Sequence, residues 1–250
     1  MQDVKRVVLV SGATSGIGEA TARTLVAQGY GVLGNGRNGD KLTELERHWG
    51  PHFCGVAGDI TDAVVQDQLF EKAAAHFGRP ANAVVVNAGR GLGGSVTEVN
   101  PADFEAILKL NVSSALALMQ KAALRFKPLV DYPHRGADIV VIGSVVGRHI
   151  SPFSAVYGST KFAVHALVEG LRREVAPWGI RATLVEPGLV LSGFQEGAGY
   201  SEAMVTHFKD KFGPLLIGED IAEAIHFILS RRPHVHVSDI LIRPTRQDDP

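Results

Sequence analysis

A tyrosine and a lysine four residues apart are the first candidates for chemistry in this chain. Tyr157 and Lys161 fall in residues 155–176, whose pattern predicts a helix, so both side chains would lie on one helical face. A free phenol has a pKa of roughly 10, too high for a base near neutral pH. A nearby ammonium favours the phenolate, and we therefore expect Lys161 to lower the pKa of Tyr157. Such a phenol could exchange a proton with a carbonyl or alcohol oxygen.

The pattern Tyr-x-x-x-Lys is short, so it needs partners before it indicates a site. Ser144 follows the predicted strand at residues 138–142, and its hydroxyl should emerge at the carboxyl edge of the sheet. There it could hold and polarise a substrate oxygen. Asn111 lies on the apolar stripe of the predicted helix at residues 101–127, where an amide must find hydrogen bonds. It could anchor a water that links Lys161 to solvent.

A glycine-rich turn follows the first predicted strand and opens the first predicted helix. Its spacing, G-x-x-x-G-x-G, permits close approach of a ligand to the backbone, and the helix N-terminus offers N–H groups to a pyrophosphate. The strand–turn–helix context favours a dinucleotide site over an ordinary glycine-rich turn, which stays the alternative. The predicted cofactor contacts of this turn are Ser11, Gly12, Thr14, Ser15, Gly16, Ile17 and Gly18.

The end of the second strand indicates which dinucleotide binds. NAD-binding folds usually place an acidic residue here to hold the ribose hydroxyls. No acid occurs between Tyr30 and Asn38, and Arg37 stands where a guanidinium could meet a 2′-phosphate. We therefore expect NADP(H) to be preferred, with NAD(H) as the alternative cofactor and a solvated arginine as the alternative reading of Arg37.

Further cofactor contacts are expected at the carboxyl ends of the third and fourth strands, where such folds bind ligands. Asp59 and Ile60 could contact the adenine, and the segment Asn87-Ala88-Gly89 could pass close to the adenosine ribose.

Short runs rich in β-branched residues alternate with longer segments of helical periodicity. Most of these runs are apolar throughout, which is typical of strands covered on both faces of a parallel sheet. The predicted strands are residues 6–10, 31–34, 53–57, 83–86, 138–142, 181–185 and 239–242. The predicted helices are residues 16–28, 40–48, 62–77, 101–127, 155–176 and 218–230. This alternation predicts an α/β fold, a Rossmann-type doubly wound parallel sheet with helices on both faces.

No domain boundary is evident, so we expect residues 1–250 to form a single dinucleotide-binding catalytic domain. Residues 188–214 lack clear periodicity yet hold several glycines and many apolar residues. A plain loop would be more polar, and we expect a mobile lid over the site of a partly apolar substrate. Lys209 and Lys211 in this segment could recruit a carboxylate or only face water.

The composition excludes several other classes of protein. The chain has 250 residues, 45% of them hydrophobic, and a formal net charge of −1, which gives no electrostatic basis for binding nucleic acid. Cys54 is the only cysteine, so no internal disulfide or thiolate-rich zinc site can form, and the ten histidines show no ligand pattern for a metal. No segment is typical of a signal peptide or a membrane span, and we expect a cytoplasmic protein.

Together these motifs resemble the short-chain dehydrogenases and reductases, over essentially the whole chain and in the family's order and spacing. The residues that carry the resemblance are the glycine turn, Asp59, Asn87-Ala88-Gly89, Asn111, Ser144, Tyr157, Lys161 and Pro187-Gly188. Among the departures, Ser11 replaces a usual threonine and Gly143 stands where a second serine is common. Residues 238–247 are similar to the branch that contains serine and 3-hydroxy-acid dehydrogenases.

The resemblance implies roles, topology and assembly. Asn111, Ser144, Tyr157 and Lys161 would form the catalytic tetrad, with Tyr157 and Lys161 also contacting the cofactor, Lys161 at the nicotinamide ribose. Further cofactor contacts would be Pro187, Gly188, Val190 and Ser192, the last where a threonine often bonds the carboxamide. The family's strand order is 3-2-1-4-5-6-7. Its members are homotetramers or homodimers, paired through the helices that correspond to residues 101–127 and 155–176.

The sequence therefore predicts an oxidoreductase that moves a hydride between NADP(H) and the carbonyl or secondary alcohol of a small substrate, with Tyr157 as general acid and base. The alternative is a catalytically silent dinucleotide sensor or scaffold, because a fold alone does not establish chemistry. A sensor would be expected to lose the tyrosine or the lysine, and this chain keeps both. Arg148 and His149 could line the substrate site or belong to an ordinary loop, and we expect His165 to be structural or on the surface.

Overall fold

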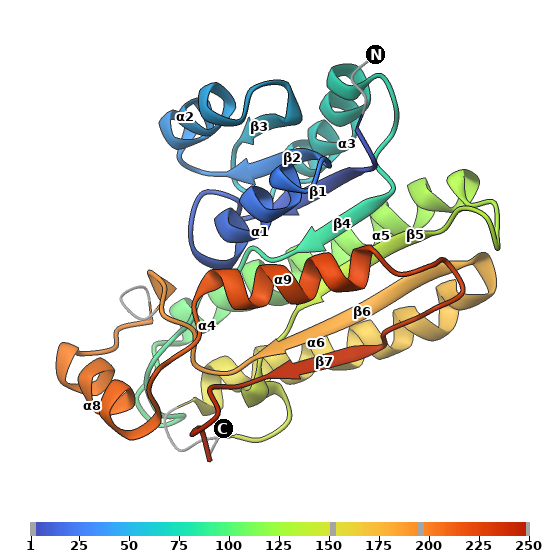
Figure 1. The fold of residues 1–250 in the computed structure, drawn as a ribbon. Helices are drawn as coiled ribbons and strands as arrows, with labels where there is room; N and C mark the ends of the chain where they lie inside the picture. Colours follow the sequence, from blue (N-terminus) through green and yellow to red (C-terminus); the bar gives the residue numbers. More distant parts are fainter. Residues whose placement is uncertain (1–3, 151–153, 195–197, 249–250) are drawn as a thin grey trace.

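The computed structural model describes residues 4–150, 154–194 and 198–248. Its seven strands form one parallel sheet in the order β3-β2-β1-β4-β5-β6-β7 (Figure 1). The strands are β1 (Val7–Ser11), β2 (Gly31–Gly36), β3 (Phe53–Ala57), β4 (Ala83–Val86), β5 (Ala137–Ile142), β6 (Ile180–Pro187) and β7 (Asp239–Ile242). The predicted Rossmann-type fold and its strand order are confirmed.

Polar residues at the helix starts explain several boundaries. The side chains of Asn38, Asp62 and Asn100 each accept a backbone N–H of the first helical turn, which satisfies a donor that the helix leaves unpaired. The α-helices are α1 (Gly16–Ala27), α2 (Gly39–Trp49), α3 (Ala63–Phe77), α4 (Pro101–Leu108), α5 (Ser114–Phe126), α6 (Ala155–Val175), α8 (Glu202–Phe212) and α9 (Gly218–Leu229).

Two segments differ from their prediction. The helix expected at residues 101–127 is divided by a π-helical turn, Lys109–Ser113, which inserts an extra residue into the helical repeat. The segment expected to be an irregular lid contains α8, whose first turn is capped by the Ser201 side chain. Residues 195–197 of that predicted lid lie outside the described residues.

Helices cover both faces of the sheet. One buried cluster joins the strands to α3, α5 and α6 through residues such as Leu69, Phe126 and Val164. The other joins them to α1, α2 and α9 through residues such as Leu25 and Ile225. Figure 1 shows α1 and α9 in front of the sheet and α5 and α6 behind it. Burial on both sides is the reason why the strands are apolar throughout.

The strand order reverses beside β1, which pairs with β2 on one side and with β4 on the other. Connections therefore leave β1 and β4 toward opposite faces and open a crevice between their carboxyl ends. Doubly wound sheets bind ligands at this point.

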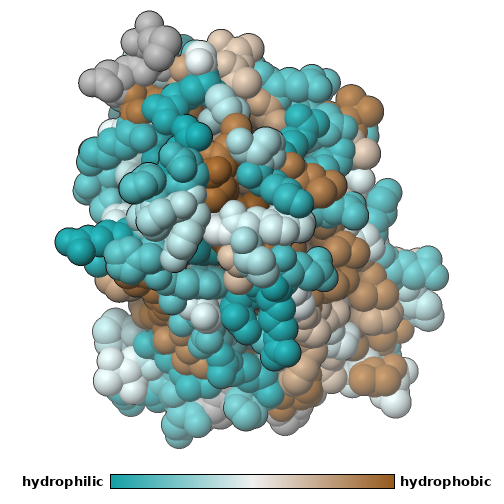
Figure 2. Space-filling model, turned by 90° about the vertical axis from the view of Figure 1, so that its right-hand side faces the viewer, coloured by the Kyte–Doolittle hydropathy of each residue, from teal (hydrophilic) through white to brown (hydrophobic). Residues whose placement is uncertain are grey.

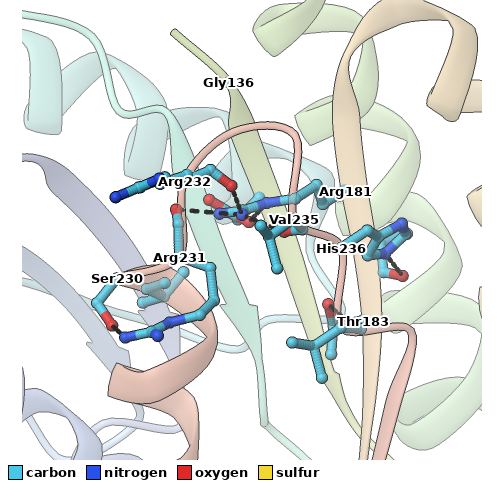
Figure 3. A network of polar contacts seen from close by, with 12 residues as sticks. Gly136, Arg181, Thr183, Ser230, Arg231, Arg232, Val235 and His236 are labelled. Atoms are coloured by element: carbon cyan, nitrogen blue, oxygen red, sulfur yellow. Dashed lines mark hydrogen bonds and ion pairs between the residues drawn. The ribbon is translucent and has the colours of Figure 1, made fainter. Parts of the chain in front are cut away.

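A buried ion-pair network lies at the amino ends of the strands, at the end of the sheet opposite the crevice. Asp138, 1% exposed, lies 2.7 Å from Arg6 and 2.7 Å from Arg181. The Arg181 guanidinium also donates to the carbonyl oxygens of Arg232 and Val235, at 2.9 Å and 2.7 Å (Figure 3). Arg181 thereby fixes the connection between α9 and β7, far from the crevice.

Figure 2 shows one face of the molecule, where hydrophilic residues predominate and hydrophobic ones gather toward the right-hand side. The exposed large apolar residues include Leu116 and Leu124 on α5 and Phe162 on α6. Among the helices of the described residues, none combines the length and the apolar character that a membrane crossing requires. The described part of the chain also groups no three His, Cys, Asp or Glu side chains as a metal site would.

Candidate active site

A cavity of about 1290 Å³ opens at the carboxyl ends of the strands, where the segments that follow β1 to β6 meet α8. The predicted site residues that line it are Gly12, Thr14, Ser15, Gly16, Ile17, Arg37, Asp59, Ile60, Asn87, Ala88, Gly89, Ser144, Tyr157, Lys161, Pro187, Gly188, Val190 and Ser192. The fold thus brings the glycine turn and three of the four predicted catalytic residues to one cavity. Ser11, Gly18 and Asn111 are not among the residues that line it.

Gly12 makes the tight turn after β1 sterically feasible. Its φ is +70°, a conformation that side chains disfavour, and an added Cβ would lie 2.9 Å from Asn87 Nδ2 and 3.1 Å from Ala88 Cα. The Asn87 amide donates to the Ser11 carbonyl at 2.9 Å, which ties the turn to the end of β4. The amino end of α1, which has no side-chain cap, consequently faces the cavity and suits a pyrophosphate.

Ser11 and Gly18 support this turn from behind the cavity wall. Ser11 is 1% exposed, and its hydroxyl oxygen accepts the backbone N–H groups of Asn87 and Ala88, both at 3.0 Å. A Cβ on Gly18 would overlap the Gly12 carbonyl oxygen. The structure therefore shows that these two residues shape the turn, and a direct contact of either with a cofactor stays a prediction.

The end of β2 presents a cation to the cavity. Asn35, 2% exposed, points inward, and its amide donates to the carbonyl oxygens of Val56 and Gly58 at 3.1 Å and 3.2 Å. Arg37 follows it, is exposed and lines the cavity. The side chain that could meet a ribose substituent here is therefore the guanidinium of Arg37.

A second cation lies near the same end of the cavity. The backbone N–H of Thr61 donates to Asp59 at 2.8 Å and holds the pKa of this carboxyl below its ordinary value, and the charges of Arg37 and Lys109 lower that pKa further. Lys109 also lines the cavity. It is absent from the sequence prediction because the pattern gave no sign of the π-helical turn that places it.

Tyr157 behaves differently from the expectation. Desolvation by the surrounding protein raises the pKa of its phenol and outweighs the hydrogen bond with Ser144, which lowers it. The Nζ atom of Lys161 lies 5.8 Å from the centre of the Tyr157 ring. The expectation of a lowered pKa for this phenol is not met, because burial disfavours the phenolate by more than its polar neighbours favour it. The phenol is neutral and can donate a proton.

Lys161 is held by the end of the sheet. It is 8% exposed, and its ammonium donates to the carbonyl oxygen of Ile142, the last residue of β5, at 2.8 Å. Burial lowers the pKa of Lys161 to about 8. The charge of this group therefore changes close to neutral pH.

Asn111 lies behind the cavity, within the π-helical turn. It is 3% exposed, its Oδ1 accepts the Arg90 N–H at 3.0 Å, and its Nδ2 donates to the Arg90 carbonyl at 2.9 Å and to Thr160 Oγ1 at 3.2 Å. The expectation that the amide finds hydrogen bonds is met. Its partners, however, make Asn111 a support for the segment after β4, and it does not line the cavity with the other three residues.

Aromatic side chains line the outer part of the cavity. The rings of Tyr157 and Phe194 meet edge to face with centres 5.4 Å apart, and those of Tyr200 and Phe208 meet in the same way at 6.1 Å. Met204 lies along the same wall. This wall suits an apolar part of a substrate.

The two lysines of the predicted lid differ in position. Lys211 lines the cavity and pairs with Asp248 at 3.5 Å, whereas Lys209 is not among the lining residues. Arg148 and His149 also stand outside the cavity. Arg148 is engaged with Glu186 and Asp239, and His149 is exposed, so the ordinary loop is the better description of that segment.

His165 lies directly behind Ser144, although the sequence analysis assigns it no part in the site. Its Nε2 accepts the Ser144 backbone N–H at 3.3 Å, and its side chain is 13% exposed. The available signal is its position four residues after Lys161, on the same face of α6.

Residues 6–202 match the family model described as short chain dehydrogenase. An uncharacterized oxidoreductase of Staphylococcus epidermidis is 31% identical over 240 residues, which cover 96% of this chain and 97% of the relative. An uncharacterized oxidoreductase of Staphylococcus aureus is 30% identical over the same shares of the two chains.

Solved structures of dehydrogenases and a reductase also superpose on almost the whole chain. A serine dehydrogenase complexed with NADP+ superposes with a TM-score of 0.82 at 26% identity and covers 97% of this chain and 96% of its own. A 3-ketoacyl-(acyl-carrier-protein) reductase from Brucella melitensis complexed with NADH superposes with a TM-score of 0.88 at 26% identity, covering 97% and 98%. A serine dehydrogenase from Escherichia coli reaches 0.79 at 27% identity, covering 97% and 100%.

The fold and the cavity at its carboxyl edge are those of a doubly wound α/β oxidoreductase. The chain belongs to the short-chain dehydrogenase family, as its motifs indicated.

Proposed function

We propose that this protein is an NADP(H)-dependent oxidoreductase that transfers a hydride between nicotinamide and the carbonyl or secondary alcohol of a small, partly apolar substrate. The observation that carries the proposal is that Ser144, Tyr157 and Lys161 line the same cavity as the glycine turn. The cofactor supplies or accepts the hydride when bound. The residues of the chain bind and orient the reactants and move the proton.

Tyr157 is the proton donor in carbonyl reduction. Its raised pKa keeps the phenol protonated at neutral pH, and Ser144, its hydrogen-bond partner, holds the substrate oxygen beside it. The ammonium of Lys161 stabilises the phenolate that remains after proton transfer. In alcohol oxidation the same phenol must first lose its proton before it can act as base.

The cavity fits a dinucleotide phosphate. The turn after β1 needs glycine at residue 12, because a side chain there would collide with Asn87 and Ala88. This tight turn leaves room for a pyrophosphate at the uncapped amino end of α1. Arg37 and Lys109 add two positive charges at the adenosine end, where a 2′-phosphate would distinguish NADP(H) from NAD(H). The proposed preference rests on these two cations and on the inward-facing Asn35 in place of an acid.

The proposed substrate has an apolar part, because Phe194, Tyr200, Met204 and Phe208 form the outer wall of the cavity. Residues 188–214, which include this wall, are proposed as its lid. A homotetramer or homodimer is the proposed assembly, supported by the exposed Leu116, Leu124 and Phe162 on α5 and α6. Light scattering coupled to size-exclusion chromatography measures the assembly directly.

The test of the function is a screen at the absorbance of the reduced nicotinamide, with many carbonyls and NADPH and many alcohols and NADP+. We expect turnover of at least one partly apolar ketone or aldehyde, and a higher kcat/KM with NADPH than with NADH. A clear preference for NADH contradicts the cofactor assignment. Dinucleotide binding without turnover across the whole panel contradicts the enzymatic function and favours a sensor.

A further inference from the structure

The ring of His165 fills a slot made by two glycines. A Cβ on Gly143 or on Gly147 would overlap the imidazole. The absence of a side chain at residue 143, just before Ser144, and the presence of a histidine on α6 therefore depend on each other. The slot places the ring against the backbone of Ser144 with little freedom to move.

The hydrogen bonds of this ring define its protonation. The Ser144 backbone N–H donates to Nε2 at 3.3 Å, which requires that Nε2 carry no proton. On the other side of the ring, Nδ1 lies 3.5 Å from Glu186 Oε2. The neutral tautomer with its proton on Nδ1 satisfies both neighbours, since it accepts from Ser144 and faces a carboxylate with an N–H.

Charged groups from three other elements keep the ring in this form. Glu186 on β6 is 0% exposed, and Arg148, in the segment after β5, donates to it through Nε at 2.5 Å and Nη2 at 2.6 Å. Arg148 also donates to Asp239 on β7 at 3.1 Å. The carboxylate of Glu186 is thus already paired and does not need a second cation.

Lys161, one helical turn away on α6, is the remaining charged neighbour. Burial lowers the pKa of His165 to about 4; Glu186 opposes this, and the charges of Lys161 and Arg148 add to it. The protein therefore supports a neutral imidazole across the neutral pH range, in agreement with the geometry.

We infer that His165 is a positioning residue that fixes the backbone of Ser144, and through it the hydroxyl, by accepting its N–H in the tautomer that the Glu186–Arg148 pair favours. This inference rests on the proposed role of Ser144 in the reaction. Ser144 has extended backbone angles, and its own Oγ accepts the Val146 N–H at 3.4 Å. Its backbone position consequently decides where the hydroxyl lies relative to Tyr157.

Two substitutions of His165 distinguish the effect of losing the hydrogen-bond acceptor from the effect of losing the ring. His165→Phe keeps a planar ring and removes the acceptor, and we expect it to lower kcat/KM for carbonyl reduction by roughly tenfold, mainly through kcat, with the Kd of NADPH unchanged. His165→Gln places an amide oxygen near the position of Nε2, and we expect it to keep activity within about threefold of the wild type. His149→Phe, on the exposed loop outside the cavity, is the matched control and should have no effect. Equal losses in the Phe and Gln variants would overturn the inference.

The same substitution in a Ser144→Ala background tests whether His165 acts through Ser144. We expect His165→Phe to cause almost no further loss there, because the group that it positions is gone. If Ser144→Ala alone leaves activity unchanged, the proposed function is wrong at Ser144. If Ser144→Ala lowers activity and His165→Phe lowers it by the same factor in both backgrounds, the inference fails and the proposed function stands.

A measurement without turnover covers the case of a variant that does not fold. Nitrogen-15 NMR of the wild-type histidines at neutral pH, assigned by through-bond correlations in the wild type, should show His165 with a protonated Nδ1 and an unprotonated Nε2. The opposite tautomer, or an imidazolium, would overturn the inference regardless of activity.

Discussion

The Nζ atom of Lys161 donates a hydrogen bond to the carbonyl oxygen of Ile142 at 2.8 Å. This bond ties the ammonium on α6 to the end of β5, the strand that leads into Ser144. Burial of the ammonium lowers the pKa of Lys161 to about 8, and burial of the phenol raises the pKa of Tyr157. The cavity thus combines a phenol that stays protonated with an ammonium that titrates near neutral pH.

The pH dependence should follow Lys161. We expect kcat/KM for carbonyl reduction to fall as the pH rises through about 8, because Lys161 then loses the charge that stabilises the developing phenolate. The pH profile of kcat/KM checks this. In Lys161→Arg the fall should move to much higher pH, since a guanidinium stays protonated. A fall at the same pH in that variant would assign it to another group.

Replacing the phenol should remove the proton donor. Tyr157→Phe should reduce kcat by at least roughly 10²-fold while the Kd of NADPH changes little, because the hydroxyl acts on the substrate oxygen. Steady-state kinetics and fluorescence titration measure the two quantities. Tyr132→Phe, at a residue that is 57% exposed and does not line the cavity, is the control. Near-full activity in Tyr157→Phe rejects the mechanism.

Removing the cation at the end of β2 should weaken NADPH selectively. Arg37→Ala should raise the KM of NADPH by roughly tenfold or more and leave that of NADH nearly unchanged, as expected for the loss of a charge-assisted hydrogen bond. Arg47→Ala, an exposed arginine of α2 outside the cavity, controls for the general loss of a positive charge. Parallel changes in both KM values would show that Arg37 does not recognise the 2′-phosphate.

His165 should make the protein sensitive to acid. Its pKa is lowered to about 4 in the folded state, from an ordinary value near 6.5, so the unfolded chain binds this proton first as the pH falls. The free energy of unfolding should therefore fall by up to roughly 3 kcal/mol as the pH drops from about 6.5 to about 4, and this contribution is complete at higher pH. Urea titrations across this range check it. His165→Gln should flatten the dependence, and an unchanged slope would be inconsistent with a buried neutral imidazole.

The ion-pair network at the amino ends of the strands should matter for stability and not for catalysis. Asp138→Ala leaves Arg181 buried without its carboxylate, and we expect a loss of roughly 3–5 kcal/mol in the free energy of unfolding. Glu169→Ala, which removes an exposed partner of Arg172 and Arg173, should change stability little. Denaturant unfolding compares the two variants. A cost as small for Asp138 as for Glu169 would contradict the role of the network.

Local patterns predicted the parts of this protein that local physics controls. The strands were predictable because a strand that is covered on both faces is a short, continuous run of apolar, β-branched residues. The turn at Gly12 was predictable because its spacing and its place after β1 are both written in adjacent residues. Tyr157 and Lys161 share a helix face by periodicity alone, and α8 was missed because its pattern is weak among several glycines.

The sequence by itself determined the sheet, the glycine turn and the pairing of Tyr157 with Lys161. Only the tertiary structure decided that Asn111 bonds Arg90 behind the cavity and that His165 accepts the backbone N–H of Ser144. It also decided that burial raises the pKa of Tyr157. The physical reason is that these three facts depend on which segments, distant in the chain, desolvate and bond one another. The spacing of residues along the chain predicts helices and strands. Burial and long-range hydrogen bonds, however, exist only once the helices have packed on the sheet.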